Sequence, residues 1–452
     1  MLSSSLFVVF LLLKKSQALQ QQQCINNPEG PLLPLLSSNQ RTCPPLVDDE
    51  SSVITGTWAP WEHSPVCFEA KATAASTRKK KLKYKASSKL CVYTTHNTWA
   101  GGALSLVTTP IVAANVASIL FDPGMPGLER ERGNRPFKAA DPRPYEVKEI
   151  NGKGLGVVAT RRIKIGEVVM VEMPALLSTL RRVDEWESKD FLRLLKGAAE
   201  GLPEEKREEL LKCARGGKGY VVYDVLNTNS FQVGVGAGVG RGIEHSGLFI
   251  GIARINHACK PNCFTRFSPS TLLMEVVAYR DIQPGEEIFI SYAPLNILSK
   301  DRRKFLQLWG FNCTCSLCAD PVASRHSDHQ RARVQELLEE LDNPKARTPE
   351  KVLNNLRDIE GLAEKEGMTA QIGDLYGIVA NIFVEMGEMK LARKYANVAV
   401  KNLKWYAGFD SERAVGAIES RERIDGKSGN LKKTARRREA TDSDLGLLGP
   451  EE

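Results

Sequence analysis

Apolar and polar positions alternate through residues 145–172, which predicts a series of β-strands. Tyr145-Glu-Val-Lys-Glu-Ile leads into a glycine-rich turn, Asn151-Gly-Lys-Gly-Leu-Gly, and apolar runs follow at Val157-Val-Ala and Val168-Val-Met-Val. Successive side chains of a strand point to opposite faces, so this alternation is typical of half-buried strands. The three glycines of the turn allow the backbone to approach a ligand closely, although most such loops are simple hairpin turns.

Helical periodicity begins after these strands. In residues 184–215, Asp184 could cap a first helix, and Pro203-Glu-Glu opens a second one that ends near Cys213. Between this region and residue 243, the segment Val233–Gly242 alternates valine and glycine. It lacks the Lys-Ser/Thr pair of a phosphate-binding loop, so we interpret it as a flexible insertion.

Residues 321–420 are predicted to form a helical region. Apolar residues recur at helical spacing from Gln330 to Leu341, and Thr348-Pro-Glu begins another helix with proline at its first position. Large and small residues then follow the tetratricopeptide pattern of paired helices at Tyr376, Val379, Ala380, Phe383, Gly387, Met389, Ala392 and Ala399. A single repeat does not make a free-standing solenoid, so we expect these helices to pack against the preceding domain. Residues 421–452, poor in apolar positions, are predicted to be a disordered tail.

The amino-terminal third differs in composition. Residues 20–123 are rich in Pro, Ser and Thr, with a short strand expected at Cys91-Val-Tyr-Thr and a helix at Pro110–Leu120. We interpret this part as a small, loop-rich module, followed by a linker over residues 124–144. In a secreted chain, four cysteines would form two disulfides with three possible pairings: Cys24, Cys43, Cys67 and Cys91.

Residues 1–19 resemble a signal peptide in length, with the apolar run Leu6–Leu13 and the ending Ser16-Gln-Ala. A signal peptide carries its positive charges before the apolar run, whereas Lys14-Lys15 follow the run here. A mis-assigned start and a disordered tail are therefore the alternative interpretations. We therefore expect the secretory pathway or an extracellular location, with the nucleus or cytoplasm as the alternative. No apolar run reaches the roughly 18 residues that span a bilayer, so no membrane partner is expected.

The overall composition indicates a folded protein. Of 452 residues, 42% are hydrophobic and 26% are charged, which is typical of globular chains. The net charge of +8 comes partly from two local runs, Arg78–Lys89 and Lys432–Arg438. We interpret both as solvated segments, with an anionic partner as the alternative, and infer no specific nucleic-acid binding.

The candidate chemistry lies in three motifs. The first is Arg254-Ile-Asn-His-Ala-Cys-Lys-Pro-Asn262, the second is Pro284-Gly-Glu-Glu-Ile-Phe-Ile-Ser-Tyr292, and the third is Phe311-Asn-Cys-Thr-Cys-Ser-Leu-Cys318. In this order and at this spacing, they resemble the SET domain of protein lysine methyltransferases over residues 145–320. The resemblance implies an α+β fold of small twisted β-sheets with a threaded pseudoknot and a post-SET zinc knuckle, followed by the helical region.

The third motif supplies three thiolates, Cys313, Cys315 and Cys318, whereas a structural zinc site needs four ligands. Disulfides or free thiols would be the competing interpretations of three cysteines alone. The resemblance implies that Cys259 is the fourth ligand and that Zn2+ has a structural role.

The resemblance also implies a site for S-adenosyl-L-methionine, with Tyr292 as the catalytic residue. The implied cofactor-binding residues are Lys153, Gly154, Leu155, Asn256, His257, Tyr292 and Phe311, and Phe231 is the implied substrate-channel aromatic. Without the resemblance, an Asn-His pair, a tyrosine at the end of a strand and an aromatic beside a cysteine cluster would most often be ordinary packing.

The SET-and-MYND subgroup is the most similar, because it joins a SET domain to tetratricopeptide-like helices. Its cysteine-rich MYND insertion is absent, since Cys213, which we expect to be an inert thiol, is the single cysteine between Glu172 and Asn256. Ala258 stands where the family usually has serine. The expected function is methylation of lysine in a protein or peptide substrate, histone or other; a catalytically silent interaction scaffold is the alternative.

Overall fold

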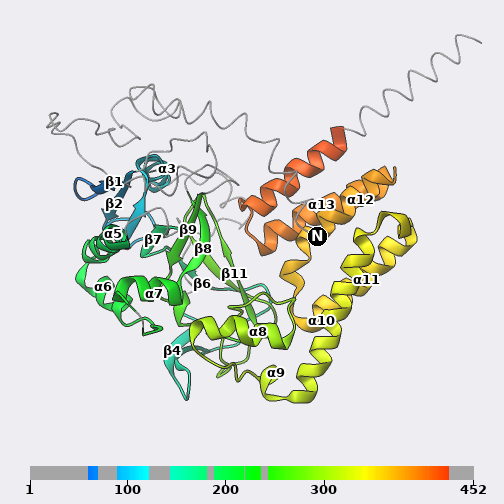
Figure 1. Cartoon of the computed structure of the whole chain (residues 1–452), viewed down its shortest axis with the longest axis horizontal. Helices are drawn as coiled ribbons and strands as arrows, with labels where there is room; N and C mark the ends of the chain where they lie inside the picture. Colours follow the sequence, from blue (N-terminus) through cyan, green and yellow to red (C-terminus); the bar gives the residue numbers. More distant parts are fainter. Residues whose placement is uncertain are drawn as a thin grey trace, which may run out of the picture.

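A computed structural model describes the chain over residues 60–69, 89–121, 143–180, 188–217, 219–235 and 243–426. The predicted signal peptide, Cys24, Cys43 and the tail beyond residue 426 lie outside these ranges, as does nearly all of the predicted linker. Figure 1 shows a body of sheets and short helices from which an arm of longer helices extends toward the C-terminal end. No helix within the described ranges is long and apolar enough to cross a membrane.

The largest sheet contains six strands, and it joins the amino-terminal region to the rest of the body. Its order is β1 (Val66–Glu69), β2 (Lys89–Thr95), β3 (Leu104–Thr108), β7 (Leu176–Thr179), β9 (Ile243–Leu248) and β8 (Phe231–Val235). Strand β3 pairs in parallel with β7, and the other neighbours are antiparallel. This corrects the expectation of a separate amino-terminal module, because its strands share one hydrogen-bonded sheet with the later ones.

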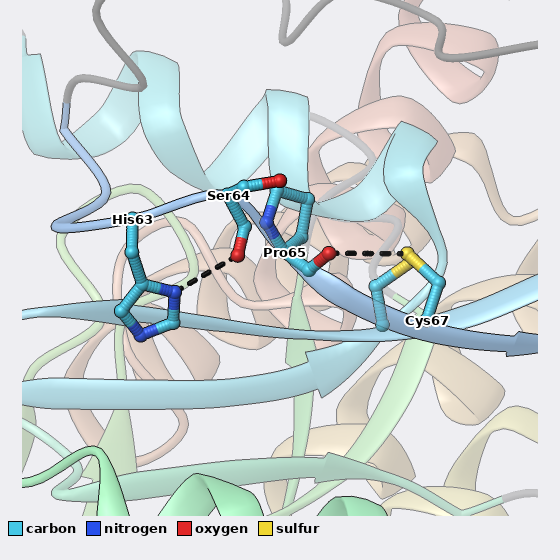
Figure 2. The surroundings of a disulfide bond; sticks show 5 residues. His63, Ser64, Pro65 and Cys67 are labelled. Carbon is cyan, nitrogen blue, oxygen red and sulfur yellow. Dashed lines mark hydrogen bonds between the residues drawn. A yellow bond between two sulfur atoms is a disulfide. The ribbon is translucent and has the colours of Figure 1, made fainter. Parts of the chain in front are cut away.

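Two expected elements of this amino-terminal part are confirmed. Cys91 lies in β2, and α3 (Pro110–Phe121) starts at the expected proline. Cys67 and Cys91 face each other across β1 and β2 and form a disulfide. Figure 2 shows the surroundings of Cys67. One of the expected bridges is therefore present.

Three smaller sheets surround the motifs. They are β11 (Cys263–Phe267) with β12 (Met274–Ala278) and β6 (Val168–Glu172), the hairpin β4 (Tyr145–Ile150) and β5 (Gly154–Ala159), and the pair β10 (Asn256–His257) and β13 (Phe289–Ile290). The strands expected in residues 145–172 are thus confirmed. Strand β10 pairs in parallel with β13, which brings the first motif alongside the second.

Short helices cover part of the large sheet. Helices α5 (Ser188–Glu200) and α6 (Glu204–Leu211) confirm the helical prediction for this region, and α7 (Val221–Asn229) precedes β8. Helix α5 packs Leu194 and Leu195 against the sheet residues Leu176 and Leu248. The interpretation of Val233–Gly242 as a flexible insertion is wrong for its first residues, because Val233 and Val235 are buried in β8. Residues 236–242 lie outside the described ranges.

The chain after the second motif is largely helical. It comprises α8 (Ser299–Leu306), α9 (Ser316–Ala319), α10 (Pro321–Asp342), α11 (Pro349–Glu366), α12 (Gly373–Glu385) and α13 (Met389–Tyr406). Helix α11 begins as expected, with the Thr348 side chain accepting a hydrogen bond from the Lys351 amide. A further helix occupies residues 412–426, so residues 421–426 of the predicted tail are helical.

The helical arm returns to the sheets near the end of α13. The Tyr406 ring lies 5.0 Å from that of Phe264 in β11, and Arg266 donates a 2.6 Å hydrogen bond to the Trp405 carbonyl. Asp410 accepts hydrogen bonds from the amide and hydroxyl of Ser270. These contacts confirm that the helices pack against the preceding domain.

Candidate active site

Tyr292 follows β13 and meets the first motif through both its backbone and its side chain. Its amide donates to Nδ1 of His257 at 3.0 Å, and its hydroxyl donates to the carbonyl oxygen of Ile255 at 2.6 Å. Burial raises the pKa of Tyr292, and the charge of Glu287 raises it further. The phenol therefore stays protonated at neutral pH, and its oxygen retains lone pairs that can face a bound substrate.

Glu287 connects three of the predicted cofactor-binding positions. Its Oε1 accepts from Nδ2 of Asn256 at 2.8 Å, and its Oε2 pairs with Nζ of Lys153 at 2.8 Å. Asn256 also donates to the carbonyl of Leu155 at 3.2 Å. The β4–β5 turn is thereby held against β10, so Lys153, Leu155 and Asn256 come together. Their role in cofactor binding stays a prediction.

Two glycines make this close approach possible. Gly154 has φ +73°, a left-handed backbone conformation that residues other than glycine rarely adopt. A Cβ at Gly156 would lie 2.5 Å from Cγ1 of Ile150 and 2.9 Å from Nδ2 of Asn256. The turn can lie this close to Asn256 because Gly156 carries no side chain.

Asn262 has a structural role that the sequence analysis did not assign. Its side chain is 1% exposed. Its Nδ2 donates to the carbonyl of Glu287 at 2.9 Å, and its Oδ1 accepts from the amide of Phe289 at 2.7 Å. The amide side chain thus substitutes for a neighbouring strand and fixes β13. Asn262 is the last residue of the first motif, and this position was the sequence feature that could have indicated its role.

Four free cysteines converge beside Tyr292. The ligand atoms of Cys259, Cys313, Cys315 and Cys318 all lie within 4.8 Å of one another. The Cys259 sulfur is 3.9 Å from that of Cys313 and 3.5 Å from that of Cys318. Tetrahedral zinc with Zn–S bonds of about 2.3 Å separates its sulfurs by about 3.8 Å. The four thiols therefore fit a zinc ion, and the disulfide interpretation does not hold because all four are free.

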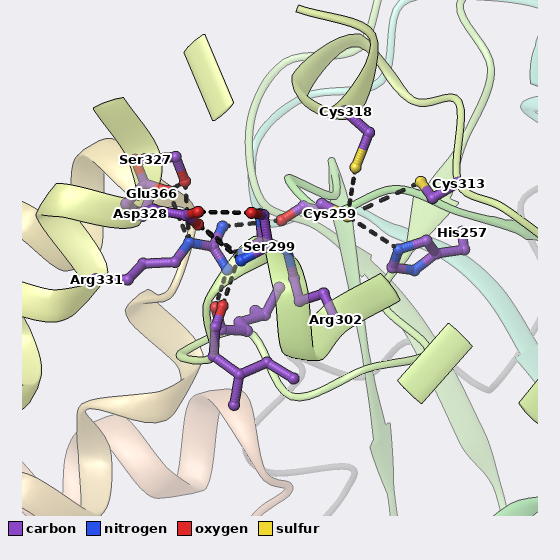
Figure 3. Close-up of polar contacts among 12 residues, drawn as sticks. His257, Cys259, Ser299, Arg302, Cys313, Cys318, Ser327, Asp328, Arg331 and Glu366 are labelled. Atoms are coloured by element: carbon purple, nitrogen blue, oxygen red, sulfur yellow. Dashed lines mark hydrogen bonds and ion pairs between the residues drawn. The ribbon is translucent and has the colours of Figure 1, made fainter. Parts of the chain in front are cut away.

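His257 contacts both Tyr292 and the cysteine group, and Figure 3 shows its ring facing Cys259. Since Nδ1 accepts from the Tyr292 amide, Nε2 carries the proton of the neutral ring and faces the Cys259 sulfur at 3.4 Å. One imidazole thus connects the candidate catalytic residue to a candidate metal ligand.

Two further aromatic rings lie near Tyr292. The Phe311 ring lies edge-on to Tyr292 at 6.4 Å, and Trp309, in the short 3-10 helix Gln307–Trp309, lies 5.9 Å away. Trp309 also donates from Nε1 to the carbonyl of Thr228 at 2.9 Å. Sequence reasoning missed Trp309, although it stands two residues before Phe311. The ring of Phe231 packs on Phe249 at 6.0 Å, so its channel role stays a prediction.

Comparison with known proteins agrees with this geometry. Residues 154–293 match the SET domain family model. The histone-lysine N-methyltransferase set5 of Schizosaccharomyces pombe is 26% identical over 279 residues, which are 60% of this chain and 81% of that protein. Human histone-lysine N-methyltransferase SMYD3 is 33% identical over 129 residues, which are 27% of each chain. Human N-lysine methyltransferase SMYD2 is 30% identical over 142 residues, 31% of this chain and 30% of that protein.

This chain therefore spans most of the length of the yeast relative but less than a third of the two human ones. The family match begins at Gly154, the first residue of β5, and ends just after Tyr292. It therefore includes Asn256, His257 and Tyr292, whereas Lys153, Phe311 and the third motif lie outside it. We conclude that residues 154–293 of this chain form a SET domain.

Proposed function

We propose that this protein transfers a methyl group from S-adenosyl-L-methionine to a lysine side chain of a protein substrate. The observation that carries the proposal is the contact between Tyr292 and the first motif, in which the phenol hydroxyl donates to the Ile255 carbonyl and the Tyr292 amide donates to His257. The relatives named above support it, because their names describe lysine methyltransferases.

The reaction is a displacement in which the lysine nitrogen forms a bond to the methyl carbon. The bond between sulfur and that carbon breaks, and sulfur keeps the electron pair. When bound, the cofactor supplies this methyl group on a cationic sulfur. Because the leaving thioether needs no proton, positioning and electrostatics carry the catalysis. The lysine must first lose its proton to solvent, and rings such as Trp309 and Phe311 favour its neutral form by excluding water.

The proposed cofactor site uses the β4–β5 turn on one side and β10 on the other. Lys153 offers an ammonium for the cofactor carboxylate, and Glu287 orients that ammonium. Asn256 and His257 supply polar groups for the ribose and adenine end, and Phe311 offers a face for stacking on adenine. In this proposal, the zinc held by the four cysteines is structural, because all four ligand positions are thiolates and none is left for water.

Cofactor binding and turnover test the proposal together. We expect calorimetry to detect binding of S-adenosyl-L-methionine, and peptide arrays to incorporate labelled methyl groups on lysine. Binding without turnover on any lysine peptide would favour a catalytically silent scaffold. Absence of binding would contradict both the cofactor site and the enzyme.

The compartment decides which substrates are available. The disulfide between Cys67 and Cys91 supports an oxidising compartment and hence the proposed entry into the secretory pathway. Sequencing of the mature amino terminus tests this, since a start near Leu19 would exclude nuclear histones as substrates. A retained Met1 would instead favour the nucleus or cytoplasm.

A further inference from the structure

Arg331 reaches from α10 into the backbone that carries the cysteine group. The residue is 1% exposed. Its Nη2 donates to the carbonyl of Cys259 at 3.1 Å, and its Nη1 donates to the carbonyl of Leu295. Its Nε donates to Oε2 of Glu366 in α11 at 3.0 Å. One guanidinium therefore joins two helices of the arm to a candidate metal ligand and to the segment that follows Tyr292.

Figure 3 shows how this contact is arranged. The Arg331 side chain points from α10 toward the Cys259 backbone, while the Cys259 sulfur points away, toward Cys313 and Cys318. The planar, forked guanidinium can donate to several acceptors at once, which a lysine ammonium does less rigidly. Arg331 thus fixes the position of the Cys259 backbone without occupying the metal position.

Two buried arginines lie near this contact. Arg302 in α8 is also 1% exposed, and its Nε and Nη2 have no hydrogen-bond partner in the part of the chain that the structure describes. Glu366, which is buried, pairs with Arg331, whereas Asp328 is partly exposed and lies 3.8 Å from Arg302. Buried charges are costly unless paired. Zinc with four thiolates carries a net charge of about −2, which would add to the attraction that holds both buried cations.

We propose that Arg331 couples metal retention by the four cysteines to the docking of α10 and α11. Metal loss then weakens the hold of α10 on the Cys259 segment, and removal of the guanidinium speeds metal loss. This reciprocity follows because both events act on the same contact. The inference rests on the zinc site proposed above and makes the helical arm a part of the catalytic unit.

The experiment uses the full chain and compares three variants. Arg331→Met removes the charge and the donors but keeps a long apolar side chain. Arg333→Met alters an arginine two residues away on the same helix, whose side chain is 47% exposed. Leu194→Ala removes buried volume from α5, outside the helical arm, and lowers stability without touching the guanidinium. Zinc content is measured first, and zinc release to a chromogenic chelator is followed at a temperature where all variants remain folded.

We expect Arg331→Met to release zinc at least about tenfold faster than the wild type, since it removes the donor to the Cys259 and Leu295 carbonyls and the cation that pairs with buried Glu366. Arg333→Met and Leu194→Ala should release it at nearly the wild-type rate. Equal rates for Arg331→Met and Arg333→Met would overturn the coupling while leaving the zinc site intact. Equally fast release from Leu194→Ala would also overturn it, because general destabilisation would then explain the effect.

A second measurement covers the case in which Arg331→Met does not fold. Hydrogen exchange of the wild type is compared with and without the metal. Faster exchange in α10 and α11 after metal removal supports the coupling, and unchanged exchange there overturns it. A wild type purified without zinc contradicts the metal site itself, which separates that failure from the failure of the coupling.

Discussion

The hydroxyl of Tyr292 donates a 2.6 Å hydrogen bond to the carbonyl oxygen of Ile255. Ile255 directly precedes the Asn256-His257 pair. The bond therefore connects the end of the second motif to the residues of the first motif that face the β4–β5 turn. The bond also fixes the direction of the phenolic proton, because the carbonyl can only accept. The position of the hydroxyl oxygen is therefore set before any substrate binds.

Replacing Tyr292 with phenylalanine should separate catalysis from cofactor binding. We expect Tyr292→Phe to lower kcat at least about 100-fold, since it removes one preorganised polar group from the reacting centre. The cofactor Kd should change by less than about threefold, because the amide of residue 292 still binds His257. Radiolabelled methyl transfer and calorimetry measure the two quantities. Tyr279→Phe is the control, since Tyr279 packs on Phe264 outside the site; strong residual turnover in Tyr292→Phe would refute the assigned role.

Trp309 and Phe231 are competing candidates for the aromatic wall of the lysine channel. We expect Trp309→Ala to lower kcat/KM for a peptide about tenfold or more, and Phe231→Ala to lower it less, because the ring of Trp309 lies against Tyr292. Peptide kinetics at saturating cofactor distinguish the two. A larger loss in Phe231→Ala would restore the assignment made from the sequence.

Much of the site was predictable because its residues lie in short motifs. Cys313, Cys315 and Cys318 are close in sequence and define most of a metal site, and the glycines at 154 and 156 mark a close backbone approach. Other features carry no local signal. The parallel pairing of β3 with β7 joins Ser105 to Leu176, and such distant pairing leaves no pattern in either strand.

Arg331 shows the same limitation for side chains. In the sequence, Arg331 is one of several charged residues in a helix and cannot be told apart from Arg333. In the structure, Arg331 is buried and Arg333 is largely solvated. Its partners Cys259, Leu295 and Glu366 come from three separate segments, so only the packed structure reveals the contact.

The buried amide of Asn262 should contribute strongly to stability. Asn262→Ala leaves the Glu287 carbonyl and the Phe289 amide without their partner, so we expect a loss of about 3 kcal/mol in the free energy of unfolding. Urea denaturation measures this change. The exposed Asn354 provides the matched control, and Asn354→Ala should stay within about 0.5 kcal/mol of the wild type. A similarly small change for Asn262→Ala would show that β13 does not depend on this clamp.

The buried imidazole of His245 predicts how stability depends on pH. In β9, its Nδ1 donates to the Ile243 carbonyl at 2.7 Å, so its Nε2 accepts from the Thr108 hydroxyl at 2.9 Å. Burial lowers its pKa to about 4, and the hydrogen bond to Ile243 opposes this only in part. The ring is therefore neutral in the folded protein, whereas it gains a proton in the unfolded chain below a pKa of about 6.5.

Because the unfolded state binds more protons, the stability contributed by His245 is complete above about pH 6.5 and is lost as the pH falls toward about 4. Between about pH 7.5 and about pH 5, this single residue should account for a loss of about 2 kcal/mol in the free energy of unfolding. His245→Gln keeps a side chain that can donate and accept but cannot titrate, so its stability should fall less over the same interval. Urea denaturation of the wild type and of His245→Gln at the two pH values measures the loss in the free energy of unfolding for each. Equal losses in the two proteins would mean that His245 already takes up its proton in the folded state.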